Sequence, residues 1–223
     1  MAAAIEAAIP NKSDTTENLP NFDVVVIGGG MAGGVAAIRL AHAGLKVALY
    51  DKEKEAHHKV CGEFLSGEGI QFLDDIGIDV RRLGAVPVTS FRLHGPKTSS
   101  EAVLPFAAVG ISRKVLDEEI LRVAANAGVE IFRGMLVKEI HSSEFSHSGR
   151  HIVATPMGLI LAKALVIATG KTEFRSLKKR IGRDRGLVGF KMHLRLTPSL
   201  AIKLGEHCDL FVFKIWLRRA PAC

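Results

Sequence analysis

A glycine-rich turn between an apolar strand and a helix-patterned segment constrains this chain more than any other feature. Residues 23–27 (DVVVI) have strand character and run directly into residues 28–33 (GGGMAG). After the helix-patterned segment, a second apolar strand at 47–50 ends on Asp51. A glycine motif alone would be weak evidence, but this order of strand, turn, helix, strand and acid is typical of the unit that binds dinucleotides.

Each part of this unit has a physical role in holding a dinucleotide. Gly28 allows the tight turn off the strand, and Gly30 has no Cβ to keep a pyrophosphate away from the backbone. Gly33 lets the helix lie close to the sheet. The helix N-terminus offers N–H groups and a positive dipole end to phosphates. Asp51 falls 23 residues after Gly28 (51 − 28), where a carboxylate can accept hydrogen bonds from a ribose.

Composition narrows the class of protein. With 48% hydrophobic and 24% charged residues, the 223-residue chain resembles an ordinary soluble globular protein. No apolar run approaches the roughly 20 residues of a membrane-spanning helix. Three scattered cysteines do not make a disulfide framework, which favours a reducing, cytoplasmic location. Residues 1–21 lack the features of a secretory signal and are expected to be a disordered leader.

Much of the net charge of +7 comes from one segment, in which seven Lys and Arg residues fall between 171 and 185. A nucleic-acid surface usually interleaves aromatic residues, and here only Phe174 does so. A solvated basic linker is therefore the preferred interpretation, and we expect no nucleic-acid partner. Attraction of an anionic substrate or a reduced nicotinamide cofactor remains a third option.

The rest of the chain alternates strand and helix patterns, which predicts an α/β layered sheet with an antiparallel insert. Lys163 interrupts the apolar run from Leu159 to Ala168, which we interpret as two strands. Helices are expected at 66–76 and 113–127. Strands are expected at 86–93, 102–104, 109–112, 129–132, 135–140, 152–154, 159–161 and 164–168.

Four segments together resemble the FAD-dependent oxidoreductases of the para-hydroxybenzoate hydroxylase fold, in particular the geranylgeranyl-reductase-like branch. The first is the glycine turn with Asp51, and the second is the loop 59–66 (KVCGEFLS). The third is the Ile-Ser-Arg sequence at 111–113 with Leu116 and Asp117, like the family's arginine at the head of a helix, and the fourth is the strand end at 166–170 (VIATG). Each segment alone is weak, but the four occur in the family's order.

The resemblance implies a Rossmann-like domain that binds the ADP half of FAD, with the flavin ring between two domains. It implies a reductase or monooxygenase of a small hydrophobic or aromatic metabolite. Since no second glycine fingerprint is present, NAD(P)H would bind transiently as the electron donor, or the electrons would come from another protein. No catalytic residue is assigned. The cofactor-binding residues that it implies are Gly28, Gly30, Met31, Ala32, Gly33, Asp51, Lys52, Lys59, Cys61, Gly62, Arg113, Val137, Ala168, Thr169 and Gly170.

The same resemblance divides the chain into an FAD-binding domain at 22–172, with inserted strands at about 84–106, and a basic linker with the start of a substrate domain at 173–223. Residues 189–194 resemble the first strand entering that domain. Complete members continue further and carry a Gly-Asp motif, which occurs nowhere in this sequence. We therefore expect a C-terminally truncated member with an incomplete substrate-domain sheet, weak FAD retention and impaired activity. A frameshift or premature stop is expected near residues 208–213, so that the tail after it was never selected as part of the fold.

Two other functions remain open. An NAD(P)-dependent dehydrogenase would need a Tyr and a Lys four residues apart, but the only tyrosine, Tyr50, lies on the second strand with Lys54 beyond Asp51. A non-catalytic nucleotide-binding module would use the basic segment as its contact surface. Cys61, with His57 and His58 nearby, has poor spacing for a metal, and no metal site is expected. The oligomeric state is left open.

Overall fold

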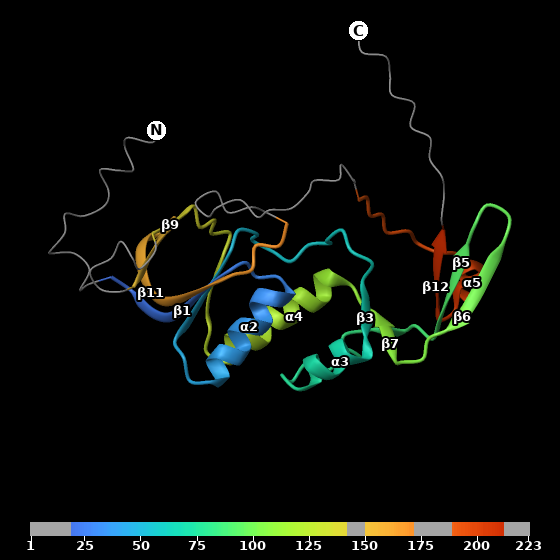
Figure 1. The fold of residues 1–223 in the computed structure, drawn as a ribbon, viewed down its shortest axis with the longest axis horizontal. Helices are drawn as coiled ribbons and strands as arrows, with labels where there is room; N and C mark the ends of the chain where they lie inside the picture. Colours follow the sequence, from blue (N-terminus) through green and yellow to red (C-terminus); the bar gives the residue numbers. More distant parts are fainter. Residues whose placement is uncertain (1–18, 142–149, 172–188, 212–223) are drawn as a thin grey trace, which may run out of the picture. The chain divides into compact units, whose positions relative to one another are not determined.

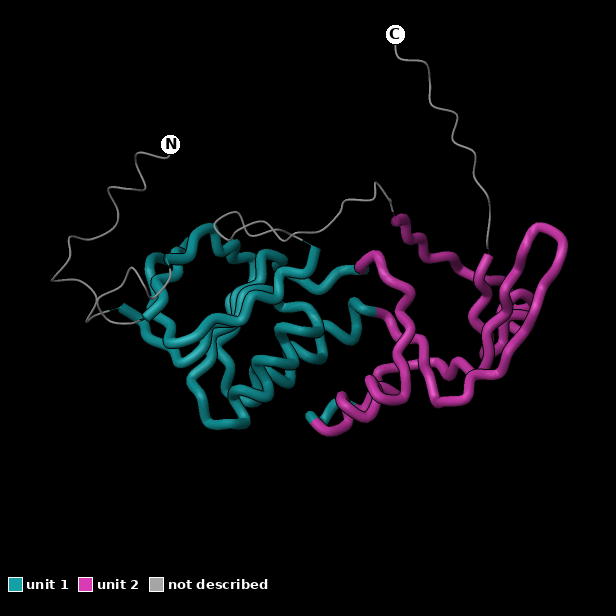
Figure 2. The backbone as a smooth tube through the Cα atoms, in the orientation of Figure 1, with its two compact units in different colours: residues 1–58, 76–78, 113–187 teal, residues 59–75, 79–112, 188–223 magenta. Residues whose placement is uncertain are grey.

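The computed structural model describes residues 19–141, 150–171 and 189–211. Two compact units make up the chain, and Figure 2 colours them separately. Unit 1 comprises residues 1–58, 76–78 and 113–187, and unit 2 comprises residues 59–75, 79–112 and 188–223. The expected leader up to residue 18, the basic segment from 172 to 188 and the tail from 212 lie outside the described residues.

A six-stranded sheet forms the centre of unit 1, in the order β8-β2-β1-β11-β10-β9. The first four strands in this order are parallel, and the last two continue as an antiparallel meander. This arrangement confirms the predicted α/β sheet with its antiparallel insert. The strands are β1 (Asn21–Ile27), β2 (Val47–Asp51), β8 (Glu130–Arg133), β9 (Glu139–His141), β10 (His151–Thr155) and β11 (Gly158–Ile167).

Two helices of unit 1, α2 (Met31–His42) and α4 (Arg113–Asn126), lie side by side (Figure 1). Their approach is close because Gly34 has no side chain: a Cβ there would lie 2.3 Å from Cγ2 of Ile120. Beneath the helices, the middle residues of β1 and β2 are fully buried, as expected for parallel strands covered on their faces. Both helices were predicted from their apolar periodicity.

The prediction of two strands between Leu159 and Ala168 is wrong, because β11 is a single strand that runs past Lys163. The Lys163 side chain is exposed, and its Nζ lies 2.7 Å from Oδ1 of Asp23. Alternate side chains of a strand point to opposite faces, so one lysine on the outer side does not interrupt the backbone pairing. The register with β1 is the same on both sides of Lys163, from Asn21 opposite Leu161 to Ile27 opposite Ile167.

Unit 2 contains two three-stranded sheets and two short helices. One sheet has the order β3-β7-β4, and the other has the order β12-β5-β6. The predicted strand at 86–93 is in fact two strands that belong to different sheets, and the predicted strand at 135–140 of unit 1 is regular only in β9. The elements are β3 (Phe64–Ser66), α3 (Gly67–Asp74), β4 (Val86–Pro87), β5 (Ser90–His94), β6 (Ser99–Val103), β7 (Ala108–Gly110), α5 (Pro198–Leu204) and β12 (His207–Phe211).

The strand β12 was not predicted, although it pairs in parallel with β5 along its whole length. Asp209 of β12 lies 2.8 Å from Nε of Arg92 and 3.0 Å from Nε2 of His94, both on β5. The expected strand at 189–194 is wrong, since these residues form no regular element. Phe190 there is 92% exposed, so among the described residues little packs against its ring to fix an extended strand.

Candidate nucleotide-binding site

The order of the parallel strands of unit 1 reverses at β1. From β1 the chain crosses through α2 to β2 on one side, while β11 lies on the other side of β1. Ligands of open α/β sheets bind outside the carboxyl ends of the strands at such a reversal. Gly28 follows directly on β1, and Ala168 follows directly on β11. The predicted glycine turn and the predicted strand end therefore meet at one place.

The backbone at this meeting point is compact enough to require glycine. Gly28 has a φ of +109°, which L side chains rarely adopt, and its N–H donates to the Tyr50 carbonyl at 2.8 Å. A Cβ at Gly28 would lie 2.4 Å from the carbonyl oxygen of Ala168. The Ala168 N–H in turn donates to the Ile27 carbonyl at 2.8 Å. These hydrogen bonds therefore join the ends of β1, β2 and β11 at the turn.

Helix α2 begins against this turn. Gly30 is its N-cap, with extended backbone and no side-chain hydrogen bond to the first turn. Gly33 in the first turn lies so near the loop that a Cβ would stand 1.9 Å from the Gly28 carbonyl oxygen. Helix-start N–H groups lack intrahelical partners, and no acidic side chain occupies the first turn of α2. The glycine-rich backbone of residues 28–33 at the positive end of the helix dipole therefore forms a cradle that suits a pyrophosphate.

Asp51 is the last residue of β2 and lies beside the glycine turn. Its Oδ1 accepts a hydrogen bond from the Glu53 N–H at 3.2 Å. Its Oδ2 approaches Gly29 so closely that a Cβ there would be only 2.5 Å away. No role was predicted for Gly29. The unbroken run of three glycines is nevertheless a signal that neighbouring residues each lie close to another part of the chain, as Gly28 does to Ala168 and Gly29 to Asp51. The carboxylate of Asp51 is therefore placed next to the cradle.

The other unit 1 residues on the predicted list have varied surroundings. Lys52 lies on the surface, with its Nζ 3.7 Å from a Glu53 carboxylate oxygen. Val137 is 3% exposed and packs in a buried apolar cluster, so its side chain belongs to the core. Thr169 and Gly170 continue from Ala168, and the φ of +65° at Gly170 turns the chain away from β11.

Arg113, the first residue of α4, is held by its own helix. Its Nε and Nη2 donate to the two carboxylate oxygens of Asp117 at 2.8 and 3.1 Å. The Asp117 side chain is almost completely buried, which fixes the guanidinium in one orientation. The sequence analysis placed Arg113 at a helix start but did not recognise Asp117, four residues later, as its partner.

Lys59, Cys61 and Gly62 belong to unit 2. The Cys61 N–H donates to the Lys59 carbonyl at 2.9 Å, the Cys61 thiol is free and partly exposed, and no atom lies within 4 Å of a Cβ built on Gly62. This loop ends at Glu63, whose φ of +54° is uncommon for a residue with a side chain.

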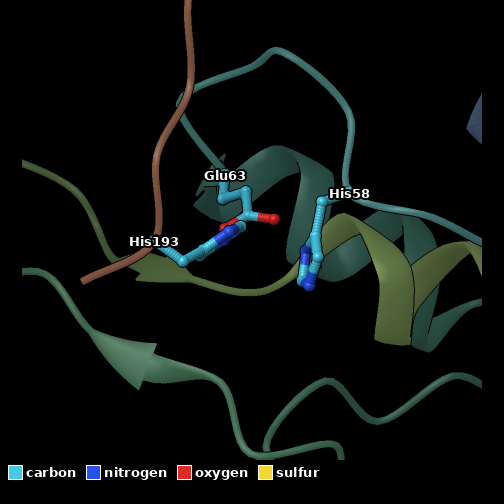
Figure 3. A group of neighbouring side chains, drawn as sticks. All are labelled: His58, Glu63 and His193. Atoms are coloured by element: carbon cyan, nitrogen blue, oxygen red, sulfur yellow. The ribbon is translucent and has the colours of Figure 1, made fainter. Parts of the chain in front are cut away.

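Glu63 connects its loop to a distant segment of unit 2. Its carboxylate lies 2.7 Å from Nζ of Lys191 and 3.4 Å from Nε2 of His193. Figure 3 draws Glu63 and His193 with their side chains directed toward each other; it also labels His58, which belongs to unit 1. Nothing in the sequence pattern of the loop 59–66 indicated that Glu63 contacts a residue roughly 130 positions away along the chain.

Tyr50 is buried within the sheet rather than placed in the site. Its ring stacks on Phe132 with 4.6 Å between the centroids. Burial, with a further contribution from the charge of Glu130, raises the pKa of Tyr50 to about 12. A buried phenol that keeps its proton cannot serve as the acid–base tyrosine of a dehydrogenase, which weakens that alternative.

Comparison with known proteins agrees with this geometry. Residues 22–181 match the model of a family described as pyridine nucleotide-disulphide oxidoreductase. Digeranylgeranylglycerophospholipid reductase 1 of Methanosphaera stadtmanae is 37% identical over 131 residues, which are 55% of this chain and 31% of the relative.

Two solved structures share the fold. The flavin-dependent brominase Bmp2 matches with a TM-score of 0.57 at 24% identity, covering 68% of this chain and 38% of the brominase. A geranylgeranyl bacteriochlorophyll reductase-like protein of Thermoplasma acidophilum matches with a TM-score of 0.52 at 23% identity, covering 68% and 40%.

The match extends over only part of each relative, since the chain spans between 26% and 41% of the length of the first curated relatives. Within the described residues, no helix is long and apolar enough to cross a membrane. The family match covers more than half of the chain and contains the glycine turn, Asp51 and the end of β11. The chain therefore belongs to the pyridine nucleotide-disulphide oxidoreductase family, among FAD-dependent oxidoreductases that include the geranylgeranyl-reductase-like branch.

Proposed function

We propose that unit 1 binds the ADP half of FAD and that the chain serves an NAD(P)H-linked oxidoreductase acting on a small hydrophobic or aromatic metabolite. The observation that carries this proposal is the cradle at the strand reversal, where a Cβ at Gly28 or Gly33 would clash with a backbone oxygen, so that only glycine lets the turn pack this closely. The N-terminus of α2 faces the pyrophosphate there, and Asp51 accepts hydrogen bonds from the ribose.

When bound, FAD supplies the redox chemistry, taking up a hydride from a nicotinamide and passing electrons to the substrate. The residues of this chain bind and orient it. Gly30, Met31 and Ala32 present backbone to the phosphates, and Ala168, Thr169 and Gly170 border the cradle from the end of β11. The relatives include reductases and a brominase, which supports an oxidoreductase but is compatible with several substrate classes. The proposal of a hydrophobic or aromatic substrate therefore rests on the family resemblance of the sequence.

We also propose that the chain by itself retains FAD weakly and has impaired turnover. Support comes from unit 2, where Phe190, Met192 and Val103 are 92, 78 and 78% exposed. Large apolar side chains in contact with water are normally covered by another element or a partner. A cofactor held mainly through its ADP half has fewer contacts than one enclosed along its whole length.

The test is a titration of the purified chain with ADP and with FAD by calorimetry. Asp51→Asn keeps the size of the side chain but removes its charge, and we expect ADP affinity to fall roughly tenfold, the typical effect of losing hydrogen bonds to a charged acceptor. Asp23→Asn is the matched control, because Asp23 is also an acid of unit 1 but bonds Lys46 N–H and Lys163 instead. Its affinity should equal that of the unmodified chain.

Equal ADP affinity in Asp51→Asn and Asp23→Asn would contradict the ribose role of Asp51. If neither ADP nor FAD bound the unmodified chain at millimolar concentration, the nucleotide site itself would be wrong. Binding of ADP with rapid loss of FAD on desalting would support both the site and the weak retention that we propose.

A further inference from the structure

One ion pair in unit 1 joins an edge strand to a helix. Nη1 and Nη2 of Arg133, at the end of β8, donate to the two carboxylate oxygens of Glu118, on α4, at 2.7 and 2.9 Å. Paired donors and acceptors in this arrangement fix both distance and angle. The Arg133 side chain is 26% exposed, and its Nε is buried without a hydrogen-bond partner among the described residues. Water would therefore be a poor substitute for Glu118 as the hydrogen-bond partner of Arg133.

The same carboxylate also holds the loop that follows Asp51. The backbone N–H of Ala56 donates to Glu118, and together with Arg133, its principal partner, keeps the pKa of the Glu118 carboxyl below its usual value. The pKa of Arg133 is raised chiefly by its hydrogen bonds to Glu118, and the negative charges of Asp51 and Glu55 raise it further. One carboxylate thus connects three segments: α4, β8 and the loop at 52–56.

Backbone hydrogen bonds beside this ion pair fasten the loop further. The N–H of Met135 donates to the Asp51 carbonyl at 2.8 Å, and the N–H of Gly134 donates to the Glu53 carbonyl at 3.1 Å. In the parallel register of the two strands, Arg133 stands directly opposite Asp51. Movement of the end of β8 would therefore move the Asp51 backbone with it.

We propose that Glu118 and Arg133 are positioning residues for the nucleotide site, which hold Asp51 in the orientation that receives the ribose hydroxyls. This inference rests on the proposed function of the site. Neither residue touches the nucleotide, and both act through the end of β8 and the loop at 52–56. Without the ion pair, Asp51 would still be present but would sample more than one orientation, and its selectivity for a ribose would fall.

The chain contains a matched control on the same helix. Glu119 and Arg122 form an equally short two-point ion pair, at 2.6 and 2.7 Å, but both residues lie on α4 and connect no second element. Glu119→Gln therefore removes the same charge one residue away from Glu118→Gln. Any effect of losing one acid from the surface of α4 should be the same in both variants.

The experiment measures the affinities of ADP and 2′,3′-dideoxy-ADP for the unmodified chain and the two variants by calorimetry. In the unmodified chain we expect ADP to bind roughly tenfold more tightly than the dideoxy compound, because only ADP can donate ribose hydroxyls to Asp51. Glu118→Gln should bring this ratio close to one, whereas Glu119→Gln should keep it. If Glu118→Gln does not fold, Arg133→Lys serves instead, since lysine keeps the charge but not the two-point geometry.

The ratio separates positioning from a general loss of stability. A merely destabilised variant binds both ligands less well by the same factor, and this result, or an unchanged ratio in Glu118→Gln, would overturn the inference while leaving the nucleotide site intact. If the unmodified chain bound neither ligand, the proposed function itself would fail. An equal loss of selectivity in Glu119→Gln would also overturn the inference, because that pair reaches no second element.

Discussion

Gly28 lies against the carbonyl oxygen of Ala168 so closely that a Cβ at residue 28 would stand 2.4 Å from it. The first of these residues directly follows β1 and the second directly follows β11, although 140 positions (168 − 28) separate them in the sequence. Their contact forms the place where the strand order reverses, which is where an α/β sheet offers a ligand its strand ends and a helix N-terminus together.

Substitution of Gly33 tests the close approach of helix and turn. In Gly33→Ala the new methyl group would meet the Gly28 carbonyl oxygen, a backbone atom that cannot rotate away. We expect a loss of roughly 1–3 kcal/mol in the free energy of unfolding, the usual range for overpacking, and weaker ADP binding. Urea denaturation followed by circular dichroism measures the first effect.

The control for this substitution is Gly95→Ala, in the turn between β5 and β6. A Cβ there meets its nearest atom, the Thr98 carbonyl oxygen, at an ordinary 3.5 Å. Its effect on unfolding should stay within about 0.5 kcal/mol. If Gly33→Ala were as stable as Gly95→Ala, helix α2 would not lie as close to the turn as described.

Tyr50 offers a pH measurement with a single reporter, because the chain has only one tyrosine. Burial raises its pKa to about 12, against about 10 in an unfolded chain. The neutral phenol is thus favoured by folding, so its contribution to stability is complete below pH 10 and is lost as the pH rises toward 12. Ultraviolet absorbance of tyrosinate should give a midpoint well above that of the chain in urea.

Circular dichroism recorded during the same titration shows whether the fold persists. A midpoint near 10 while the fold is intact would mean that the ring of Tyr50 is not enclosed between the sheet and Phe132. In Tyr50→Phe, which keeps the stacked ring but has no ionisable group, the stability lost between pH 10 and 12 should be smaller.

Asp209 tests the attachment of β12 to β5. Its hydrogen bond with His94 and, next, the charge of Arg92 hold the pKa of the Asp209 carboxyl below its usual value. Stabilisation of this contact is therefore complete above the unfolded pKa of about 3.9 and is lost as the pH falls through the lower folded value. The protection factors of the amides at 207–211, which correct for the intrinsic pH dependence of exchange, should fall across that acidic range.

In Asp209→Asn the same amides should exchange faster at neutral pH and should lose the acidic transition. The amides of β10 in unit 1 provide the control and should be unaffected by the substitution. Unchanged exchange at 207–211 in this variant would show that β12 is attached by its backbone pairing alone.

Local sequence patterns predicted most of unit 1, and for a physical reason. The strand, turn and helix of residues 21–42 are determined by neighbours in the sequence: an apolar run, glycine and helical periodicity. Asp51 could be assigned because it ends a strand at a fixed distance from that turn. The continuous strand across Lys163 was not predicted, because composition alone cannot distinguish an exposed position within a paired strand from a break between two strands.

Contacts between distant segments could not be predicted in the same way. Glu118 and Arg133 are fifteen residues apart and meet only because α4 packs beside β8. The pairing of β12 with β5 joins segments that are 117 residues apart at Ser90 and His207. Neither strand is long or strongly patterned, so each gains its structure from its partner. Such partnerships depend on tertiary packing, which a single sequence does not reveal.

The most direct test of the central claim is a calorimetric titration of ADP into the unmodified chain, repeated with Asp51→Asn. The account predicts saturable binding at one site per chain, with an affinity that falls roughly tenfold in the variant as hydrogen bonds to the carboxylate are lost. Absence of binding, or binding that Asp51→Asn leaves unchanged, would contradict the claim that the glycine turn and Asp51 form a nucleotide site.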